Sequence, residues 1–299
     1  MLTMPPLEGA VLNFLPFIAT GIGLGAVYGM SAIGLVVLYR SSGTINFAFG
    51  ALGAAGAHLT WALIEYAGFP ILPAWLAGIA LATLLSYGYG RLVSSRLADR
   101  SQSVRAMATL GFALLILGTI TTIFGPGLPR RLSLPTDLVN IVIFGVKISL
   151  TRILAFLFAI LTMLLMSLLL SRTRIGLAMR ALANNRRISS QIGIDVVRVD
   201  SIAWLISGMF AGICGLVFAD LLLMSPIPLT FLVIPALAAA VLGRLTSMAW
   251  ALVGGMIAGL AEALLTAVPA VSSMRSAAPY VIALIFIALS RSMPSGERE

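Results

Sequence analysis

The chain has 299 residues, of which 60% are hydrophobic and only 10% are charged, and its formal net charge at pH 7 is +9. Soluble domains carry roughly 25% charged residues, so this composition argues against a soluble enzyme or binding module and indicates an integral membrane protein. The positive charge does not indicate nucleic-acid binding. Most of the arginines lie in short polar stretches between apolar segments, where they act as topology signals and contact lipid headgroups.

The N-terminus lacks the pattern of a cleavable signal peptide. Residues 1–12 contain Glu8 and no lysine or arginine, so the positive region that opens a signal peptide is missing. The first apolar run, from Val11 to Leu38, is far longer than the apolar core of a signal peptide. We therefore expect it to remain as a membrane helix.

Apolar segments then follow one another along the chain, and several reach the ~20 residues that a helix needs to cross a bilayer. The segments are 13–38, 44–66, 71–92, 106–124, 152–171, 201–225, 229–242, 248–268 and 277–291. The seventh is short and contains Pro235, so a half-helix or re-entrant piece is an alternative to a full span. The expected fold is all-α: a polytopic transmembrane helical bundle with eight or nine membrane segments, forming one domain over residues 1–299.

The distribution of basic residues predicts the orientation. With the N-terminus outside, the cytoplasmic loops hold fourteen arginines and the outer side holds five basic residues, so the positive-inside rule predicts an external N-terminus and a cytoplasmic C-terminus. Residues 172–200 are then cytoplasmic, and the other long connection, 125–151, is external. Within it, the run Val139–Ile148 is expected to form a small hairpin or a surface helix.

The membrane segments are rich in glycine. The glycines lie in the first segment (Gly21, Gly23, Gly25 and Gly29), the second (Gly50, Gly53 and Gly56) and the eighth (Gly254, Gly255 and Gly259). Lipid supplies no hydrophobic force between helices, so close backbone approach at small residues is what packs them. Kinks or sliding during transport are the alternative role for these glycines.

Residues 172–200 form the longest polar interruption in the second half of the chain, with six arginines, two aspartates and a net charge of +4. Asn184 or Asn185 is suited to cap the start of a helix over Arg186–Ile192, and Gly193 suits the left-handed position after its end.

The predicted helix has an apolar face, because Ile188 and Ile192 lie four residues apart. A helix of two turns is only marginally stable by itself in water. It therefore needs a surface to lie on.

Three stretches, taken together, resemble the permease subunits of branched-chain amino-acid ABC importers. They are Gly25–Leu35 with Gly43–Ala48; Arg174–Ala181 with Asn184 and Ile192–Ile194; and Ala239–Gly243 with Gly254–Leu264. They occur in the family's order and spacing, and the chain length resembles the shorter of the family's two permease types. The family's His-Gly after Asn-Phe-Ala is replaced here by Phe49–Gly50, and its Gly-Gly pair by Gly243–Arg244. These departures leave the substrate open.

The resemblance implies a permease subunit of an ABC importer in the bacterial inner membrane, which moves branched-chain or related small amino acids or amides by alternating access. The implied partners are two cytoplasmic ATP-binding subunits, a second permease subunit that is expected to be a different chain, and a periplasmic substrate-binding protein. Residues 172–200 would couple the permease to the ATPases; the alternative for their short basic helix is to lie on anionic headgroups. The residues implied in coupling are Arg174, Gly176, Arg180, Ala181, Asn184, Arg186, Arg187 and Gly193.

Three acidic residues lie within apolar segments: Glu65, Asp220 and Glu262. A charge at the bilayer centre costs about 3 kcal/mol or more on insertion scales, so such residues usually face a cavity or a partner. Asp220 and Glu262 are candidates to line the outward part of a translocation path, and a structural hydrogen bond is the alternative for each. Asn46 and His58 are further candidates for the path.

The sequence contains no constellation for covalent chemistry. A phosphate-binding P-loop needs Gly-Lys-Ser/Thr, and the one lysine, Lys147, has no such neighbours. With one histidine and one cysteine (Cys214), we expect no metal site, no cofactor and no enzymatic activity. The alternative function is an ion-gradient-driven secondary transporter or channel for a small polar solute, with Asp220 and Glu262 as ion or proton sites.

Overall fold

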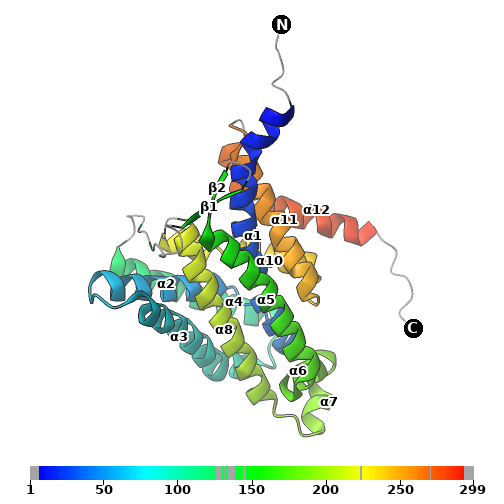
Figure 1. Ribbon diagram of the computed structural model, residues 1–299. Helices are drawn as coiled ribbons and strands as arrows, with labels where there is room; N and C mark the ends of the chain where they lie inside the picture. The colour runs from blue at the N-terminus through cyan, green and yellow to red at the C-terminus, as the bar shows by residue number, and fades with distance from the viewer. Residues whose placement is uncertain are drawn as a thin grey trace.

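The computed structural model describes residues 7–125, 130, 132, 139–143, 146–222, 224–269 and 271–292. These residues form a bundle of α-helices with one small antiparallel hairpin (Figure 1). The elements are α1 (Leu7–Ser42), α2 (Phe49–Glu65), α3 (Ile71–Tyr89), η1 (Gly90–Ser94), η2 (Ser95–Leu97), α4 (Gln102–Phe124), β1 (Asn140–Ile143), β2 (Val146–Ser149), α5 (Leu150–Arg172), α6 (Arg174–Asn184), α7 (Arg186–Gln191), α8 (Val196–Leu221), α9 (Pro226–Thr230), α10 (Val233–Leu242), α11 (Met248–Thr266), η4 (Ser272–Ala277) and α12 (Ala278–Ser292).

The bundle has two distinct ends. β1 and β2 lie at one end, and α6 and α7 lie at the other (Figure 1). We call these the hairpin end and the α6–α7 end. α5 joins them with 23 residues, a length of about 34 Å, which matches the thickness of a bilayer's hydrocarbon core.

Six helices in the described part of the chain are long and apolar enough to cross a membrane. They are Phe14–Ser42, Ile71–Leu97, Gln102–Phe124, Leu150–Arg172, Val196–Leu221 and Met248–Thr266. The other three predicted segments are also helical but shorter, in α2, in α9 with α10, and in α12. The fold is therefore that of an all-α, multi-pass membrane protein. The further two or three crossings stay a prediction.

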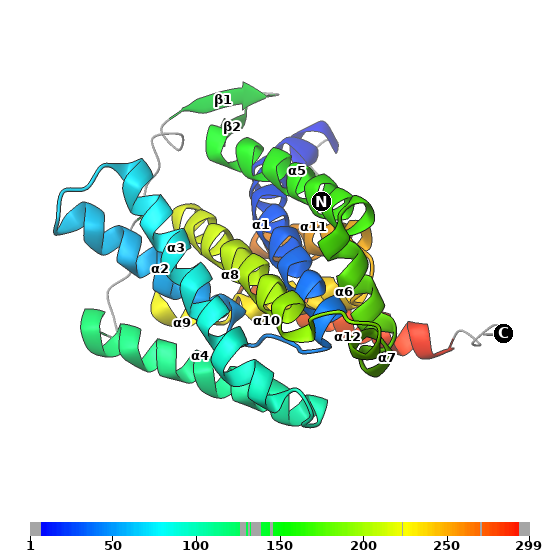
Figure 2. The same cartoon turned by 90° about the horizontal axis from the view of Figure 1, so that it is seen from below.

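α1 is the central helix of the bundle. In its most apolar stretch 94% of the residues are buried, against 22% in the corresponding stretches of α3 and α4. Viewed along the bundle, α5, α8 and α11 surround it (Figure 2). A helix of this hydrophobicity buried on all sides belongs to the interior of a membrane bundle.

α1 packs most extensively against α11, and glycines make this contact close. A Cβ atom placed on Gly25 would lie 2.8 Å from the Met256 Cα, and one on Gly259 would lie 2.5 Å from the Gly25 Cα. These obstacles are backbone atoms, which a rotamer change cannot move away. The packing role predicted for these glycines is what the structure shows.

The seventh predicted segment is interrupted. α9 ends at Thr230 and α10 begins at Val233. Pro235 explains the break, because it cannot donate to the carbonyl four residues earlier and its ring would clash with that carbonyl in a continuous helix. In α10 it lies in the first turn, where a proline is tolerated. This agrees with the half-helix interpretation.

The second segment begins later than predicted. Residues 43–48 are not regular helix, and α2 starts at Phe49 rather than near residue 44. Gly43 has a left-handed backbone (φ 65°), and the Asn46 Oδ1 accepts the N–H of Ala48 at 3.0 Å, which favours a turn over a helix. The sequence analysis did not weigh this turn chemistry.

The predicted external connection contains a hairpin. β1 and β2 pair antiparallel, with Ile141 opposite Ile148, which confirms a hairpin over a surface helix. Within that connection, residues 126–129, 131, 133–138 and 144–145 lie outside the described residues, and so does Arg298 near the C-terminus.

Candidate functional site

The polar stretch 172–200 contains two helices, where the sequence predicted one. The Thr173 hydroxyl accepts the N–H of Gly176 at 3.0 Å and thereby caps the start of α6. Met179 and Leu182 lie three residues apart on its buried face. α6 was not predicted from the sequence, because its apolar positions lie within a stretch whose high positive charge is typical of a polar loop.

α7 forms as predicted, to within one residue. The Asn185 Oδ1 accepts the N–H of Ile188 at 3.0 Å, so Asn185, and not Asn184, is the cap. Gly193 has φ 89°, and the N–H of Ile194 donates to the Ser189 carbonyl at 3.1 Å. This is the hydrogen bond that closes a helix with a left-handed glycine after its end.

α6 is held tightly against the end of α5. A Cβ atom on Gly176 would lie 2.5 Å from the Leu170 Cα, so no larger residue fits here without moving one helix. Arg180 turns back toward α5, where its Nη2 donates to the Ser171 carbonyl at 3.4 Å. It also lines, with Arg40, a cavity of about 330 Å³. Any force applied to α6 therefore reaches α5 directly.

The opposite face of this segment is exposed. Ile188 is 54% exposed and Ile192 is 70% exposed, so the apolar face predicted for α7 is left uncovered by the described part of the chain. Arg187 is also exposed on α7. On α6, Arg174 and Leu177 are exposed. We call these five residues the α6–α7 outer face.

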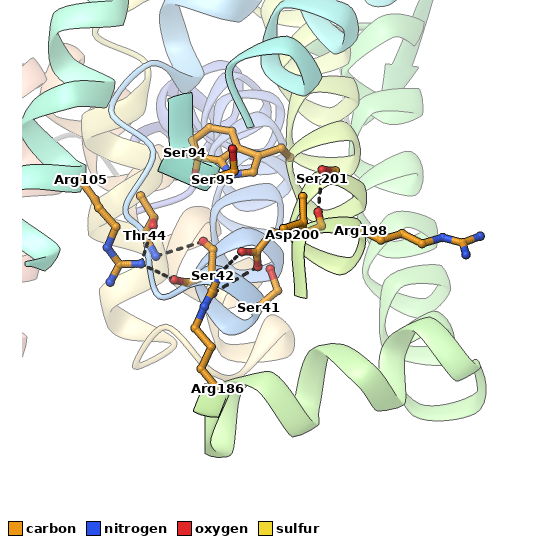
Figure 3. Close-up of polar contacts among 12 residues, drawn as sticks. Ser41, Ser42, Thr44, Ser94, Ser95, Arg105, Arg186, Arg198, Asp200 and Ser201 are labelled. Atoms are coloured by element: carbon orange, nitrogen blue, oxygen red, sulfur yellow. Dashed lines mark hydrogen bonds and ion pairs between the residues drawn. The ribbon is translucent and has the colours of Figure 1, made fainter. Parts of the chain in front are cut away.

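Arg186 points the other way. Its guanidinium forms an ion pair with the Asp200 carboxylate at the start of α8, and its Nη1 lies 3.4 Å from the Oδ1 (Figure 3). The Asp200 side chain is 10% exposed and the Arg186 side chain 31%, so the carboxylate is largely removed from water while the guanidinium stays partly exposed. Arg186 therefore does not belong to the outer face. It joins α7 to α8 as an internal link.

Arg105 of α4 lies beside this pair. Its Nη1 donates to the Ser42 carbonyl at 2.6 Å and to the Thr44 Oγ1 at 3.1 Å, just after the end of α1 (Figure 3). Arg105 is also close enough to interact electrostatically with Arg186 and Asp200. We call Arg105, Arg186 and Asp200, with Ser42 and Thr44, the inner polar cluster. It connects α4, α7, α8 and the segment between α1 and α2.

The sequence analysis missed the roles of Arg105 and Asp200. Arg105 was counted only as a topology signal, and Asp200 only in the charge of the loop. The available signal was an acid at the membrane end of a basic loop, since such a carboxylate needs a cationic partner when it is buried. Which arginine supplies the partner depends on the angle between α7 and α8, and the sequence does not specify that angle.

A second site lies toward the hairpin end, where Glu262 lines a pocket of about 670 Å³. The Tyr28 hydroxyl donates to the Glu262 Oε2 at 2.8 Å. Arg275 and Tyr280 line the same pocket, together with apolar residues of α1, α8, α9 and α10. Glu262 therefore lines a cavity and also accepts the structural hydrogen bond that was the alternative for it, and its role in a translocation path stays a prediction.

The four residues predicted for a translocation path do not meet. Asp220, near the end of α8, is not among the described residues that line the Glu262 pocket. His58 is buried in α2, with Nδ1 2.8 Å from the Ala54 carbonyl and its ring 5.4 Å from that of Phe124. Asn46 is buried at the turn before α2, and its Nδ2 finds no hydrogen-bond partner among the described residues.

Three further coupling candidates lie outside both the outer face and the inner polar cluster. Ala181 is half-buried, and Asn184 is exposed at the end of α6. Gly193 terminates α7 and contacts nothing that a side chain would displace. The structure thus places Gly176 and Arg180 against α5, Arg174 and Arg187 on the outer face, and Arg186 in the inner polar cluster. Ala181, Asn184 and Gly193 belong to neither group.

Residues 17–289 match the family model described as the branched-chain amino acid transport system permease component. This region covers the central helix, the α6–α7 segment and the Glu262 pocket. The match therefore includes both candidate sites.

Curated proteins and a solved structure are also similar over most of the chain. The high-affinity branched-chain amino acid transport system permease protein BraD of Pseudomonas aeruginosa is 25% identical, over 85% of this chain and 86% of its own length. The probable branched-chain amino acid transport permease protein LivH of Methanocaldococcus jannaschii is 29% identical, over 79% of this chain and 76% of its own. A chain of the PsaBC complex from Streptococcus pneumoniae shares the fold, with a TM-score of 0.51, 13% identity and 97% of both chains covered.

Proposed function

We propose, from the premise that this chain belongs to the permease family of branched-chain amino acid transport systems, that it forms the membrane path of an ATP-driven importer for branched-chain or related small amino acids or amides. Its partners would be two cytoplasmic ATP-binding subunits, a second permease subunit and a periplasmic substrate-binding protein. The membrane would be a bacterial inner membrane. Of the two functions predicted from the sequence, family membership favours this one over an ion-gradient-driven transporter.

The observation that carries the coupling role is the α6–α7 outer face. Two isoleucines and three further exposed residues, two of them arginines, project from a pair of short helices whose other face is fixed to α5 and α8. Exposed apolar side chains with a basic rim are typical of a surface that binds a protein partner. We assign this face to an ATP-binding subunit.

The inner polar cluster would transmit the motion. When a bound ATPase moves α7, the Arg186–Asp200 pair moves the start of α8, and Arg105 lies between this pair and the α1–α2 connection. Gly176 and Arg180 carry the same displacement to α5. Small movements at one end are thus passed to several membrane helices, as alternating access requires.

Lipid headgroups are the competing surface for α7. An amphipathic helix lying on a bilayer turns its apolar face toward the acyl chains and its basic residues toward the headgroups. The capping hydrogen bond of Asn185 stabilises α7 itself, and the ion pair of Arg186 holds α7 to α8 without any lipid. Crosslinking from position 188 distinguishes contact with an ATPase from contact with headgroups.

The remaining assignments extend the proposal. The whole chain would act as one transmembrane domain, with the hairpin end outside, the α6–α7 end in the cytoplasm and nine crossings if α2, α9–α10 and α12 each cross. Glu262 would line the outward part of the path. Asp220, His58 and Asn46 are proposed for the path on sequence grounds alone.

The proposal is tested by reconstituting the chain with its co-purified partners into vesicles and measuring uptake of radiolabelled leucine. ATP-dependent uptake that requires the substrate-binding protein is expected. Uptake driven by an ion gradient without ATP would contradict the proposal and support the alternative function.

A coupling variant sharpens this test. Arg180→Glu places a carboxylate where Arg180 donates to the Ser171 carbonyl, so we expect uptake to fall at least about tenfold while ATP hydrolysis continues. Lys147→Glu, an equal charge reversal in the exposed hairpin, is the matched control. Equal uptake in both variants would remove Arg180 from the coupling path.

A further inference from the structure

The Glu262 pocket is built from the hairpin-end halves of several helices. α8 starts beside α7 and therefore ends toward the hairpin, and the pocket contacts Phe218 near its end. The same pocket contacts the first half of α1 at Thr20 and the second half of α11 at Glu262. Its volume of about 670 Å³ is in the range of about 300–1,000 Å³ that is usual for small-molecule sites.

The pocket carries one acidic and one basic side chain among the described residues that line it, Glu262 and Arg275. The two interact electrostatically, yet they do not approach within the 4.0 Å of an ion pair. The two charges therefore face the same space without neutralising each other by direct contact.

Tyr28 fixes the position of the carboxylate. Its hydroxyl donates to the Glu262 Oε2 at 2.8 Å, across 234 residues of sequence. Within the described part of the chain no group donates to the Oε1, so one oxygen stays available to a ligand. A carboxylate held in this way is a preorganised acceptor for an ammonium group.

The rest of the wall is mainly apolar. Leu24, Phe218, Phe231 and Leu232 line the pocket, and the last two are the residues at the break between α9 and α10. Irregular backbone at membrane depth is tolerated where it lines a cavity, and broken helices recur at the substrate sites of transporters. The break is therefore independent support for this cavity as a place that substrate occupies.

We propose that this pocket binds an α-amino acid as its zwitterion, with the ammonium group at Glu262, the carboxylate at Arg275 and an apolar side chain against Phe218, Phe231 and Leu232. The inference rests on the proposed importer function and assigns a substrate site within it. A ligand with a single charge satisfies only one of the two groups, and Arg275 opposes a bare cation. The zwitterion satisfies both.

Thiol protection tests the proposal on the intact transporter. Cys214 is buried and is the only cysteine, so Cys214→Ala followed by Ser276→Cys places one reactive thiol at the exposed pocket lining. Maleimide labelling of this thiol in the purified complex should slow at least about threefold with millimolar leucine. No protection by leucine would overturn the proposal.

Two analogues test the charges separately. 3-Methylbutylamine keeps the ammonium group and the apolar chain, and 4-methylpentanoate keeps the carboxylate. Each should protect the thiol less than leucine at equal concentration. Equal protection by either analogue would show that the zwitterion is not what the site recognises.

Two variants test the residues. Glu262→Gln and Arg275→Gln should each abolish protection by leucine, while Glu65→Gln and Lys147→Gln, which change exposed charges outside the pocket, should preserve it. Protection that survives both pocket variants would overturn the assignment. Leucine uptake by the unsubstituted complex separates the two claims: uptake with no protection rejects this site alone, and no ATP-dependent uptake rejects the importer function itself.

Discussion

Asp200 illustrates how one residue determines what a surface loop can transmit. Its carboxylate is largely buried and pairs with Arg186, so α7 is attached to α8 by a charged contact in addition to chain connectivity. Removing one partner of such a pair leaves the other charge without compensation, which costs more than the pair itself contributes. The link is therefore sensitive to substitution on either side.

We predict that Asp200→Asn lowers the stability of the α7–α8 connection by about 1.5–3 kcal/mol, because Arg186 loses its charged acceptor. The melting temperature in detergent should fall, and more ATP should be hydrolysed per leucine transported. Glu65→Gln, which neutralises an exposed acid away from this pair, should change neither quantity. Identical behaviour of the two variants would show that the pair transmits nothing.

At the residue scale, the sequence identifies charges better than it identifies their partners. Glu262 stands out as an acid in an apolar segment, and the structure places it in a pocket. Its hydrogen-bond partner, Tyr28, lies 234 residues away and could not be inferred without the packing of α1 on α11. For the same reason, the pairing of Arg186 with Asp200 could not be inferred without the packing of α7 on α8.

Among the elements, α7 was predictable because its signals are local. A capping asparagine, a glycine after the last turn and two isoleucines four residues apart specify a short helix without reference to the rest of the fold. α6 also has a capping residue and an apolar face, but the arginines in the same stretch are typical of a charged loop, so the helix was not predicted. The late start of α2 combines the local turn at Asn46 with a contact to α4, where the N–H of Phe47 donates to the Thr109 Oγ1 at 3.1 Å; the second of these is not visible in the sequence.

The exposed face of α7 leads to a prediction at the scale of a single helix. Ile188→Ser combined with Ile192→Ser should leave folding unchanged, because both side chains are exposed in this chain, but should reduce co-purification of the ATP-binding subunit at least about tenfold. Quantitative immunoblotting of the tagged complex measures this. The control is Ile141→Ser, an exposed apolar residue of the hairpin. Undiminished co-purification would place the ATPase contact elsewhere.

The contact between α1 and α11 leads to a second prediction at the scale of the helices. A Cβ on Gly255 would lie 2.5 Å from the Gly29 Cα, so Gly255→Ala should separate the two helices and lower stability by about 1–3 kcal/mol. Thermal unfolding in detergent should show a lower midpoint. Gly88→Ala is the comparison, because nothing lies within 4 Å of a Cβ at that position. Equal midpoints would mean that the close approach of the helices is not needed for stability.

For the whole molecule, the structure places at opposite ends the two connections that the positive-inside rule predicts on opposite sides of the membrane, and the orientation itself stays a prediction. The arginines of α6 and α7 gather at one end, and the hairpin with Lys147 lies at the other, about one bilayer thickness away. The family match over residues 17–289 covers both ends, so one fold contains the proposed coupling surface and the proposed substrate pocket.

Orientation can be measured directly. In a Cys214→Ala background, a membrane-impermeant maleimide should label Ile141→Cys in intact cells, and should label Arg172→Cys only after permeabilisation, since both positions are exposed, lie at opposite ends and are outside the proposed ATPase contact. Labelling of Arg172→Cys in intact cells would reverse the proposed topology and remove the coupling role of α6–α7.

The central claim is that α7 contacts an ATP-binding subunit. The most direct measurement replaces Ile188 with a photoreactive amino acid, irradiates native membranes and identifies the crosslinked products by mass spectrometry, with Ile141 as the control position. We predict a crosslink from position 188 to an ATP-binding protein that is absent from position 141. Crosslinks from position 188 to lipid alone would contradict this proposal and show that α7 lies on lipid headgroups.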